Sequence, residues 1–251
     1  MSSLLTTQER GQFDATGWLL LRGLCAEPLP DLVAEIDRLS IPGAPEVLRH
    51  EERRDDGEVQ LARLERLADA SPLLRTIMES GPLAQVAAEL LREPVALFKD
   101  KANFKLAGGA GFSVHQDLPA YPGVASVVSA MVALDPATVA NGCLECASGA
   151  HHDVLPQDER GCVVSAVVET LVFEPVALDA GDVVFFHGLA PHRSAPNRSA
   201  TDRRALFPTW APASAGDLRA AYYEAKLSAF AGDAEGEKRL SLIGDFEGEL
   251  V

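Results

Sequence analysis

The sequence predicts a mainly β fold, a jelly roll or barrel, with helices added at both ends. From residue 95 onwards, short apolar runs alternate with turns rich in glycine and proline, which is typical of antiparallel barrels and sandwiches. The first 94 residues and residues 216–230 carry helical signals instead. A chain of 251 residues can form one sizeable β domain with helical additions. We therefore expect a single domain over residues 1–251.

Helical signals dominate the N-terminal part, about residues 1–94. Residues 6–17 have the pattern of a short capped helix closed by glycine, and a strand is expected directly after it. Apolar residues recur at helical spacing over residues 28–39. Proline follows serine or glycine at two helix-start signals, which predicts two short helices over residues 71–92.

The segment between these helices is rich in charge. Residues 40–60 contain proline, glycine and the charge run 51–56, and we expect a solvated loop there. A mobile lid over the functional site is the less favoured alternative. Leu61, Leu64 and Leu67 then resume a helical spacing.

The jelly-roll core is expected over about residues 95–212, followed by a helix at 216–230. The predicted strands are residues 95–106, 126–134, 143–147, 163–178, 182–187 and 203–210. The first of them has an apolar face and a polar face made of Lys99, Lys101, Asn103 and Lys105. Pattern alone favours the apolar face in the core and the lysines in water.

Composition restricts the partners. The chain has 22 basic and 37 acidic residues, a formal net charge of −15. Such a surface repels nucleic acids and anionic membranes, so we expect neither as a partner. The N-terminus has no basic region followed by an apolar run, no apolar stretch approaches 18 residues, and the four cysteines fit buried reduced thiols. We expect a cytoplasmic monomer or homodimer that binds a small molecule.

Two segments carry residues with metal-ligand chemistry. His115 and Asp117 are two residues apart near the end of a predicted strand, where both can face one metal ion. His187 and His192 both follow a later strand, and each could supply a third ligand. Two histidines and one carboxylate on one face of a metal leave three positions open, as in non-haem Fe(II) oxygenases.

An arginine follows the second histidine by eleven or twelve residues. Arg203 or Arg204 could hold a dicarboxylate beside the metal through two parallel hydrogen bonds. Adjacent strand residues face opposite ways, so only one of the two can do so.

The motifs together resemble a known family. They are His115-Gln-Asp117, Asn141-Gly-Cys-Leu-Glu-Cys-Ala-Ser-Gly-Ala-His151, Gly181-Asp182, His192-x-Ser194-x-x-Asn197 and Arg203. In this order, between about residues 95 and 225, they are similar to those of the phytanoyl-CoA dioxygenase family. Its members are oxygenases dependent on Fe(II), 2-oxoglutarate and O₂, built on a double-stranded β-helix, a cupin-like jelly roll.

The resemblance implies a function for particular residues. It implies His115, Asp117 and His192 as the catalytic metal ligands, and Arg203, Ser194 and Asn103 as contacts of 2-oxoglutarate. The reaction it implies is hydroxylation of a C–H bond in a small molecule. Because Asp117 is present, halogenation, for which related enzymes lack this carboxylate, is not expected.

The resemblance also bears on the substrate. If Asn103 faces the barrel interior, Lys101 and Lys105 must face it too and form a cationic pocket wall. Residues 98–105 and 216–223 resemble the family branch that contains 2-aminoethylphosphonate hydroxylase. We therefore expect a small anionic or zwitterionic substrate such as an aminophosphonate or amino acid, with His151 as a further pocket residue.

Three alternatives remain open from the sequence. An oxygenase of this kind could instead tailor a natural product by hydroxylation, desaturation or epoxidation. A non-catalytic jelly roll that binds a metal or ligand would need no dicarboxylate clamp. A zinc hydrolase could use the same three ligands.

Overall fold

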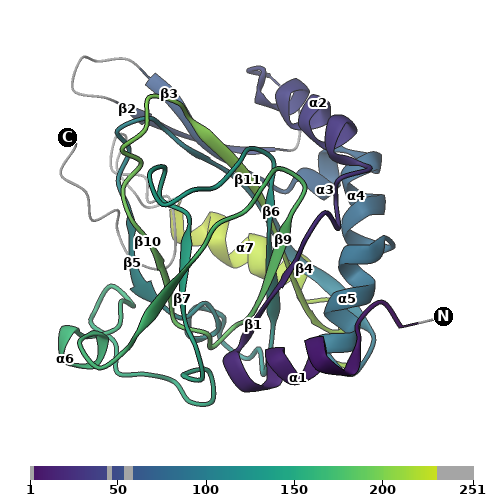
Figure 1. Cartoon of the computed structure of the whole chain (residues 1–251). Coiled ribbons are helices and arrows are strands. Elements are labelled where there is room, and N and C mark those ends of the chain that lie inside the picture. The colour runs from purple at the N-terminus through teal and green to yellow at the C-terminus, as the bar shows by residue number, and fades with distance from the viewer. Residues whose placement is uncertain (1–2, 44–46, 54–58, 231–251) are drawn as a thin grey trace.

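The computed structural model describes residues 3–43, 47–53 and 59–230 of the chain. It contains two antiparallel sheets that face each other as a jelly roll, as predicted (Figure 1). The seven-stranded sheet has the order β1 (Trp18–Leu21), β9 (Val183–His187), β6 (Val128–Ala133), β11 (Arg203–Pro212), β4 (Val95–Lys105), β3 (Val59–Glu65), β2 (Leu48–Arg53). The four-stranded sheet has the order β5 (Phe112–His115), β10 (His192–Ser194), β7 (Leu144–Ala147), β8 (Phe173–Val176).

Helices cover the outer face of the larger sheet. They are α1 (Thr7–Thr16), α2 (Leu29–Ser40), α3 (Leu67–Ala70), α4 (Pro72–Glu79) and α5 (Pro82–Leu91), with α6 (Ser165–Val168), α7 (Arg219–Phe230) and the 3-10 helices η1 (Leu118–Ala120) and η2 (Ala213–Ala215) elsewhere. Figure 1 shows α2, α4 and α5 on one side of the larger sheet and the smaller sheet on the other. No helix within the described ranges is long and apolar enough to cross a membrane.

The apolar core has two main parts. The larger lies between the helices and the outer face of the seven-stranded sheet, where Ile36, Leu74 and Val86 pack with Trp210. The Trp210 indole N–H donates to the Met78 carbonyl at 2.7 Å, which ties β11 to α4. The smaller cluster lies between the two sheets. The sheets are thus held together by apolar contacts at one end, which leaves room for polar side chains at the other.

The first helix forms as its sequence predicts. The Thr6 hydroxyl accepts from the Glu9 amide while the Glu9 carboxylate accepts from the Thr6 amide, a reciprocal cap. Gly17 ends the helix at φ 84°, a conformation that favours glycine. A side chain at Gly17 would also collide with the His151 ring, which its Cβ would approach to 2.5 Å.

The N-terminal part is less helical than predicted. Strands β1, β2 and β3 all join the seven-stranded sheet, so the helical pattern assigned to Leu61 and Leu64 is wrong. Strand β3 has both faces covered, with Leu64 in the helix-packed core and Arg63 and Glu65 on the other side, facing the cavity described below. The polar face of this strand is therefore covered by the rest of the molecule and does not meet bulk water as in a half-exposed strand.

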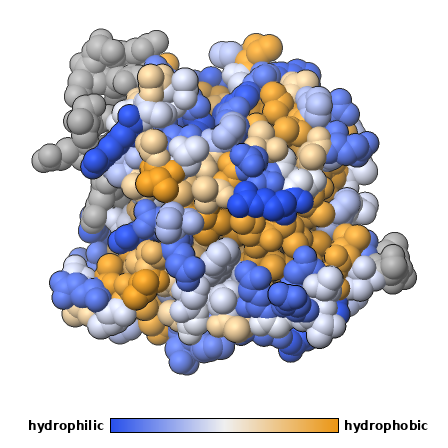
Figure 2. Space-filling view, in the orientation of Figure 1, coloured by the Kyte–Doolittle hydropathy of each residue, from blue (hydrophilic) through white to orange (hydrophobic). Residues whose placement is uncertain are grey.

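Two further segments, residues 163–178 and 40–60, differ from the prediction, and part of the second lies outside the described residues. Residues 163–178 form the short helix α6 and the strand β8, not one long strand, because their main-chain bonds close a helical turn at Ser165–Val168. The expected loop at 40–60 contains strand β2, while residues 44–46 and 54–58, with much of the charge run, lie outside the described residues. On the face drawn in Figure 2, hydrophilic residues dominate the periphery and apolar ones gather near the middle.

Candidate active site

A cavity of about 1160 Å³, including its open mouth, lies between the two sheets. It is bounded by strands β3, β4 and β11 of the larger sheet, by β5 and β10 of the smaller one, and by α7. Every lysine and arginine that is buried in the described ranges lines it: Arg63, Lys99, Lys105, Arg203 and Lys226. Buried cations are rare unless they are paired, so this wall is built to meet anions.

Three side chains with metal-ligand chemistry meet in the cavity wall. One donor atom each from His115, Asp117 and His192 lies within 4.8 Å of the other two. His192 is the cross-strand partner of His115, and the two ring centroids are 4.2 Å apart. Asp117 lies beyond the end of β5, at the N-cap of η1, so a turn brings it to the histidines, not the strand alternation expected. Two imidazoles and one carboxylate fit Fe(II) with open positions.

Main-chain carbonyls orient both imidazole rings. His115 Nδ1 lies 2.8 Å from the Ser113 carbonyl, and His192 Nδ1 lies 2.9 Å from the Ala190 carbonyl. Each Nδ1 therefore carries the proton and leaves Nε2 free to bind a metal. Burial lowers the pKa of His115 to about 3 and lowers the pKa of His192 as well, which keeps both rings neutral.

Asp117 is held as a carboxylate. Ser129 Oγ donates to Asp117 Oδ2 at 3.2 Å, and it is bonded to the Thr209 hydroxyl at 2.8 Å. Burial alone would raise the pKa of Asp117, but the neighbouring charges of Lys99 and Lys101 hold that pKa below its usual range. The ligand set is thus in the protonation state that metal binding requires.

A second polar group lies where β4, β10 and β11 meet. Arg203 and Lys105 are direct partners across β11 and β4, so both side chains project from one face. Lys105 Nζ donates to Ser194 Oγ at 2.8 Å and contacts the carbonyls of Ala195 and Gly142. Arg203 Nη2 donates to the Gly142 carbonyl at 3.2 Å. These contacts leave two neighbouring cations facing the cavity.

This group fits one end of a dicarboxylate. Arg203 Nε is buried and has no hydrogen-bond partner among the described residues. Burial lowers the pKa of Arg203 to about 10, and burial together with the Arg203 charge lowers the pKa of Lys105 to about 7. A carboxylate placed here would satisfy the guanidinium fork and restore the ordinary basicity of both cations.

A third group of cations lies on the same face of β4. Lys99 and Lys101 are the two lysines whose charge acts on Asp117. Lys99 Nζ contacts the Tyr121 hydroxyl and lies 4.4 Å from the centre of that ring, while Lys101 Nζ lies 5.4 Å from the Phe207 ring centre. Burial lowers the pKa of both lysines. An anion beside the metal ligands would stabilise their charged forms.

Strand β3 and helix α7 complete this end of the cavity. Arg63 lies opposite Asn103 and donates from Nε to its Oδ1 at 2.9 Å. Glu65 lies opposite Lys101, and Lys226 of α7 donates to both Glu65 oxygens at 2.6 and 2.7 Å. The carboxylate at this end is thus already bound by a lysine of the protein itself.

The predicted residues are mostly brought together. His115, Asp117, His192, Arg203, Ser194, Asn103, Lys101 and Lys105 all line the cavity. The polar face of β4 therefore points into the cavity, and the placement in water that its pattern favours is wrong. The apolar side of the strand packs on the helices and so is buried as well.

Arg204 and His187, the alternatives to Arg203 and His192, lie outside the candidate site. Arg204 points away from the cavity and pairs with Asp135 at 2.8 Å and Asp37 at 2.6 Å. His187 packs 5.7 Å from the ring of His151 and is not part of the metal-ligand cluster. The expectation of a pocket position for His151 is corrected, because the turn after β7 carries it against Gly17, outside the residues that line the cavity.

Several cavity residues were not predicted. Arg63, Glu65, Tyr121, Tyr222 and Lys226 come from segments whose pattern indicated helix or loop. Lys99 is the exception, since it shares the face of Lys101 and Lys105 and could have been included by strand alternation.

A jelly roll with a buried His-Asp-His cluster and a cationic clamp beside it is the architecture of a non-haem iron oxygenase. The chain belongs to the phytanoyl-CoA dioxygenase family, whose model matches residues 13–205. It is accordingly a dioxygenase that uses iron, 2-oxoglutarate and O₂ to hydroxylate its substrate.

Two relatives are similar to this chain over nearly its whole length. A methylphosphonate hydroxylase from Gimesia maris is 33% identical over 255 residues, 99% of this chain and 98% of that protein. A 2-aminoethylphosphonate dioxygenase from an uncultured bacterium is 31% identical over 240 residues, 93% of this chain and 92% of that protein. Among solved structures, EctD from S. alaskensis with 2-oxoglutarate and 5-hydroxyectoine matches with a TM-score of 0.74 at 20% identity, covering 85% of this chain and 78% of that one, which supports the shared fold.

Proposed function

We propose that this dioxygenase hydroxylates the carbon bonded to phosphorus in a small phosphonate. The observation that carries the proposal is a second pair of cations, the buried Lys99 and the partly buried Lys101, beside Asp117 and apart from Arg203 and Lys105. One dicarboxylate cosubstrate accounts for the pair at Arg203. The pair at Lys99 then remains for an anionic group of the substrate, and two relatives similar over nearly the whole chain are named for phosphonates.

The residues divide into three tasks. His115, Asp117 and His192 would hold the iron through Nε2, a carboxylate oxygen and Nε2. Arg203, Lys105 and Ser194 would bind the distal carboxylate of 2-oxoglutarate, which moves Lys105 from the substrate to the cosubstrate. Asn103, bonded to Arg63, lies between these two pairs along β4 and would separate the two anions.

When bound, the iron and 2-oxoglutarate supply the oxidising chemistry. The balance is one C–H bond, one O₂ and one 2-oxoglutarate converted to one C–OH, one succinate and one CO₂. The protein's part is to fix the phosphonate so that its neighbouring carbon faces the open metal positions. Lys99 is buried and Lys101 partly buried, and both project from one strand face, so both ammonium groups would reach the anion directly from the cavity wall.

The test is succinate formation by the Fe(II)-loaded protein with panels of alkylphosphonates, amino acids, acyl-CoA thioesters and large neutral natural products. We expect succinate to form in step with a hydroxylated phosphonate, read by mass spectrometry and ³¹P NMR. Lys101→Met should raise the KM for the phosphonate and leave the KM for 2-oxoglutarate nearly unchanged. Coupled turnover only with large neutral compounds, unaffected by Lys101→Met, would contradict the proposal and favour natural-product tailoring.

A further inference from the structure

The buried ion pair between Glu65 and Lys226 lies inside the candidate substrate end of the cavity. We propose that Lys226 places its own ammonium group where Glu65 would otherwise bind an ammonium group of the substrate, so that the cavity selects phosphonates without an amino group. The inference rests on the proposed function and names a substrate class within it. The aminophosphonate suggested by the sequence resemblance becomes the disfavoured substrate.

Glu65 is the group that could bind a substrate ammonium. It lies directly opposite Lys101 across β3 and β4, and both side chains line the cavity. Facing side chains on paired strands have Cβ atoms about 5 Å apart. A phosphonate held at Lys101 would therefore carry a substituent two carbons away into reach of Glu65.

Both carboxylate oxygens of Glu65 already accept hydrogen bonds from a side chain of the protein. Lys226 Nζ lies 2.6 and 2.7 Å from its two oxygens, while Arg63 Nη1 lies 3.6 Å and His50 Nε2 3.4 Å away. Burial alone would raise the pKa of Glu65, but His50, Arg63 and Lys226 hold it well below its usual range. The carboxylate is thus ionised and surrounded by donors, so a further ammonium would meet like charge instead of an open acceptor.

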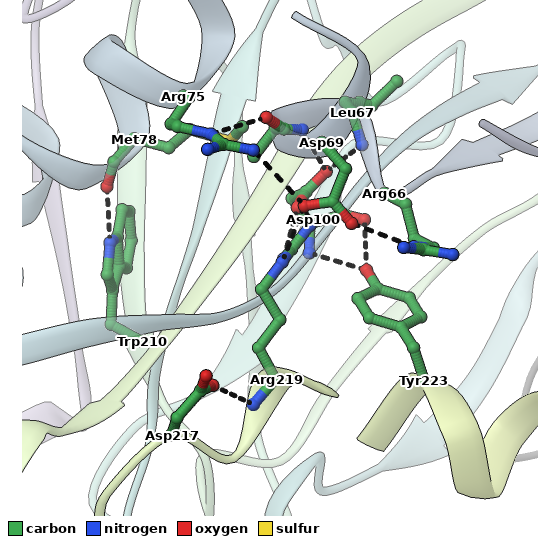
Figure 3. Close-up of polar contacts among 11 residues, drawn as sticks. Arg66, Leu67, Asp69, Arg75, Met78, Asp100, Trp210, Asp217, Arg219 and Tyr223 are labelled. Atoms are coloured by element: carbon green, nitrogen blue, oxygen red, sulfur yellow. Dashed lines mark hydrogen bonds and ion pairs between the residues drawn. The ribbon is translucent and has the colours of Figure 1, made fainter. Parts of the chain in front are cut away.

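Helix α7 holds Lys226 in this position. Figure 3 shows Arg219 and Tyr223, both from α7, reaching Asp100 of β4. Arg219 Nη1 lies 2.6 Å from Asp100 Oδ1, and the Tyr223 hydroxyl donates to the Asp100 carbonyl at 3.1 Å. Asp100 lies between Lys99 and Lys101 and faces the opposite side of the strand. The strand that presents the phosphonate-binding lysines therefore also fixes the helix that presents Lys226.

Tyr222 supports the same conclusion from a neighbouring position. It lies four residues before Lys226, on the same side of α7, and lines the cavity. Its ring packs 4.9 Å from Phe98 and 5.9 Å from Tyr121. The surface next to the Lys226–Glu65 pair is thus aromatic and suited to an alkyl group, which agrees with an uncharged substituent on the phosphonate.

The experiment compares two probes of nearly the same shape, propylphosphonate and 2-aminoethylphosphonate, which differ by a methyl group in place of an ammonium. Binding is read as the shift in Tm of protein loaded with metal and 2-oxoglutarate under nitrogen, and turnover as hydroxylated product in air. We expect the unaltered protein to prefer propylphosphonate by about tenfold or more, as expected for a mismatched charge in a buried site. Lys226→Met should shift the preference toward 2-aminoethylphosphonate by a similar factor.

Two control variants separate specificity from folding. Lys226→Arg keeps a cation beside Glu65 and should keep the preference for propylphosphonate. The double variant Lys226→Met with Glu65→Gln removes the carboxylate and should lose the gain seen with Lys226→Met alone. If Lys226→Met lowers Tm, 2-aminoethylphosphonate should restore more of it than propylphosphonate does.

The outcomes distinguish the two proposals. Phosphonates that bind and turn over in every variant, with the same ratio between the two probes, would overturn the assignment to Lys226 and leave the proposed function in place. A gain for 2-aminoethylphosphonate that persists in the double variant would also overturn it. If no phosphonate binds or turns over in any variant, the proposed function fails, and this inference fails with it.

Discussion

His192 and His187 are separated by four residues, yet only His192 lies with His115 and Asp117. His192→Ala and Asp117→Ala should each weaken Fe(II) binding by at least about a hundredfold, since loss of a ligand exceeds loss of a ligand's hydrogen-bond partner. His187→Ala should leave metal binding nearly unchanged, because that ring packs against His151. Anaerobic Fe(II) titration with metal analysis measures all three. Unchanged iron affinity in Asp117→Ala would contradict the ligand set.

Arg203 and Arg204 form a matched pair, because they are adjacent on β11 and point in opposite directions. Removing a buried charge partner costs about 2–5 kcal/mol, so Arg203→Ala should raise the Kd for 2-oxoglutarate by roughly thirtyfold or more. Arg203→Lys should recover part of it, since an ammonium lacks the guanidinium fork. Arg204→Ala removes the pairs with Asp135 and Asp37 and should change stability but not this Kd. A larger Kd effect in Arg204→Ala would reverse the assignment.

The lowered pKa of Lys105 predicts that 2-oxoglutarate binding depends on pH. Its pKa is about 7 because it is buried beside Arg203, while Cys143 and Glu145 act in the opposite sense. A bound carboxylate favours the ammonium form and raises this pKa. Binding should therefore take up a proton above pH 7, and 2-oxoglutarate affinity should fall as pH rises through and above 7. Calorimetry in buffers of different ionisation enthalpy measures the uptake, and Lys105→Met should abolish it.

Among the elements, strand β4 shows which properties of a strand its residue pattern predicts and which it does not. Alternation correctly separates Lys101, Asn103 and Lys105 from Ala102, but it does not show which face meets water, because both faces are covered by other parts of the molecule. The same burial hid β3, whose residues Arg63 and Glu65 serve the cavity. Alternation of polar and apolar residues predicts one polar face and one apolar face. It does not distinguish a polar face that meets solvent from one that lines an internal polar cavity.

Helix α7 carries a prediction of its own. The Tyr223 hydroxyl donates to the Asp100 carbonyl and accepts from its amide, which ties the helix to β4. Tyr223→Phe should cost about 1–3 kcal/mol of stability, the range for buried groups left without a partner. Because α7 supplies Tyr222 and Lys226 to the cavity, the substrate KM should rise while the KM for 2-oxoglutarate stays nearly constant. Equal rises in both would show that α7 acts on the whole cavity and not on its substrate end.

In the molecule as a whole, the buried positive charges lie together although the net charge is negative. The chain carries a formal charge of −15, yet all of its buried lysines and arginines in the described ranges face one cavity. Net charge could be read from composition, and the order of the motifs around His115, His192 and Arg203 was enough to predict the jelly roll. The gathering of distant cations such as Arg63 and Lys226 depends on β3 and α7 meeting β4, a contact between segments with no motif in common. Sequence pattern therefore predicted the metal-ligand cluster better than the substrate wall.

This segregation predicts how cosubstrate affects the stability of the whole protein. Arg203 and Lys105 are desolvated, and their hydrogen bonds go to main-chain carbonyls and the Ser194 hydroxyl, so the protein without 2-oxoglutarate retains their unfavourable burial. A ligand at 100 times its Kd that binds only the folded state adds about 2.7 kcal/mol, which corresponds to a Tm increase of roughly 5–10 °C for a chain of this length. Scanning calorimetry of the metal-loaded protein under nitrogen should show this increase with 2-oxoglutarate, and a clearly smaller one for Arg203→Ala at the same concentration. An increase of equal size in Arg203→Ala would mean that the stabilising carboxylate contact lies elsewhere in the cavity.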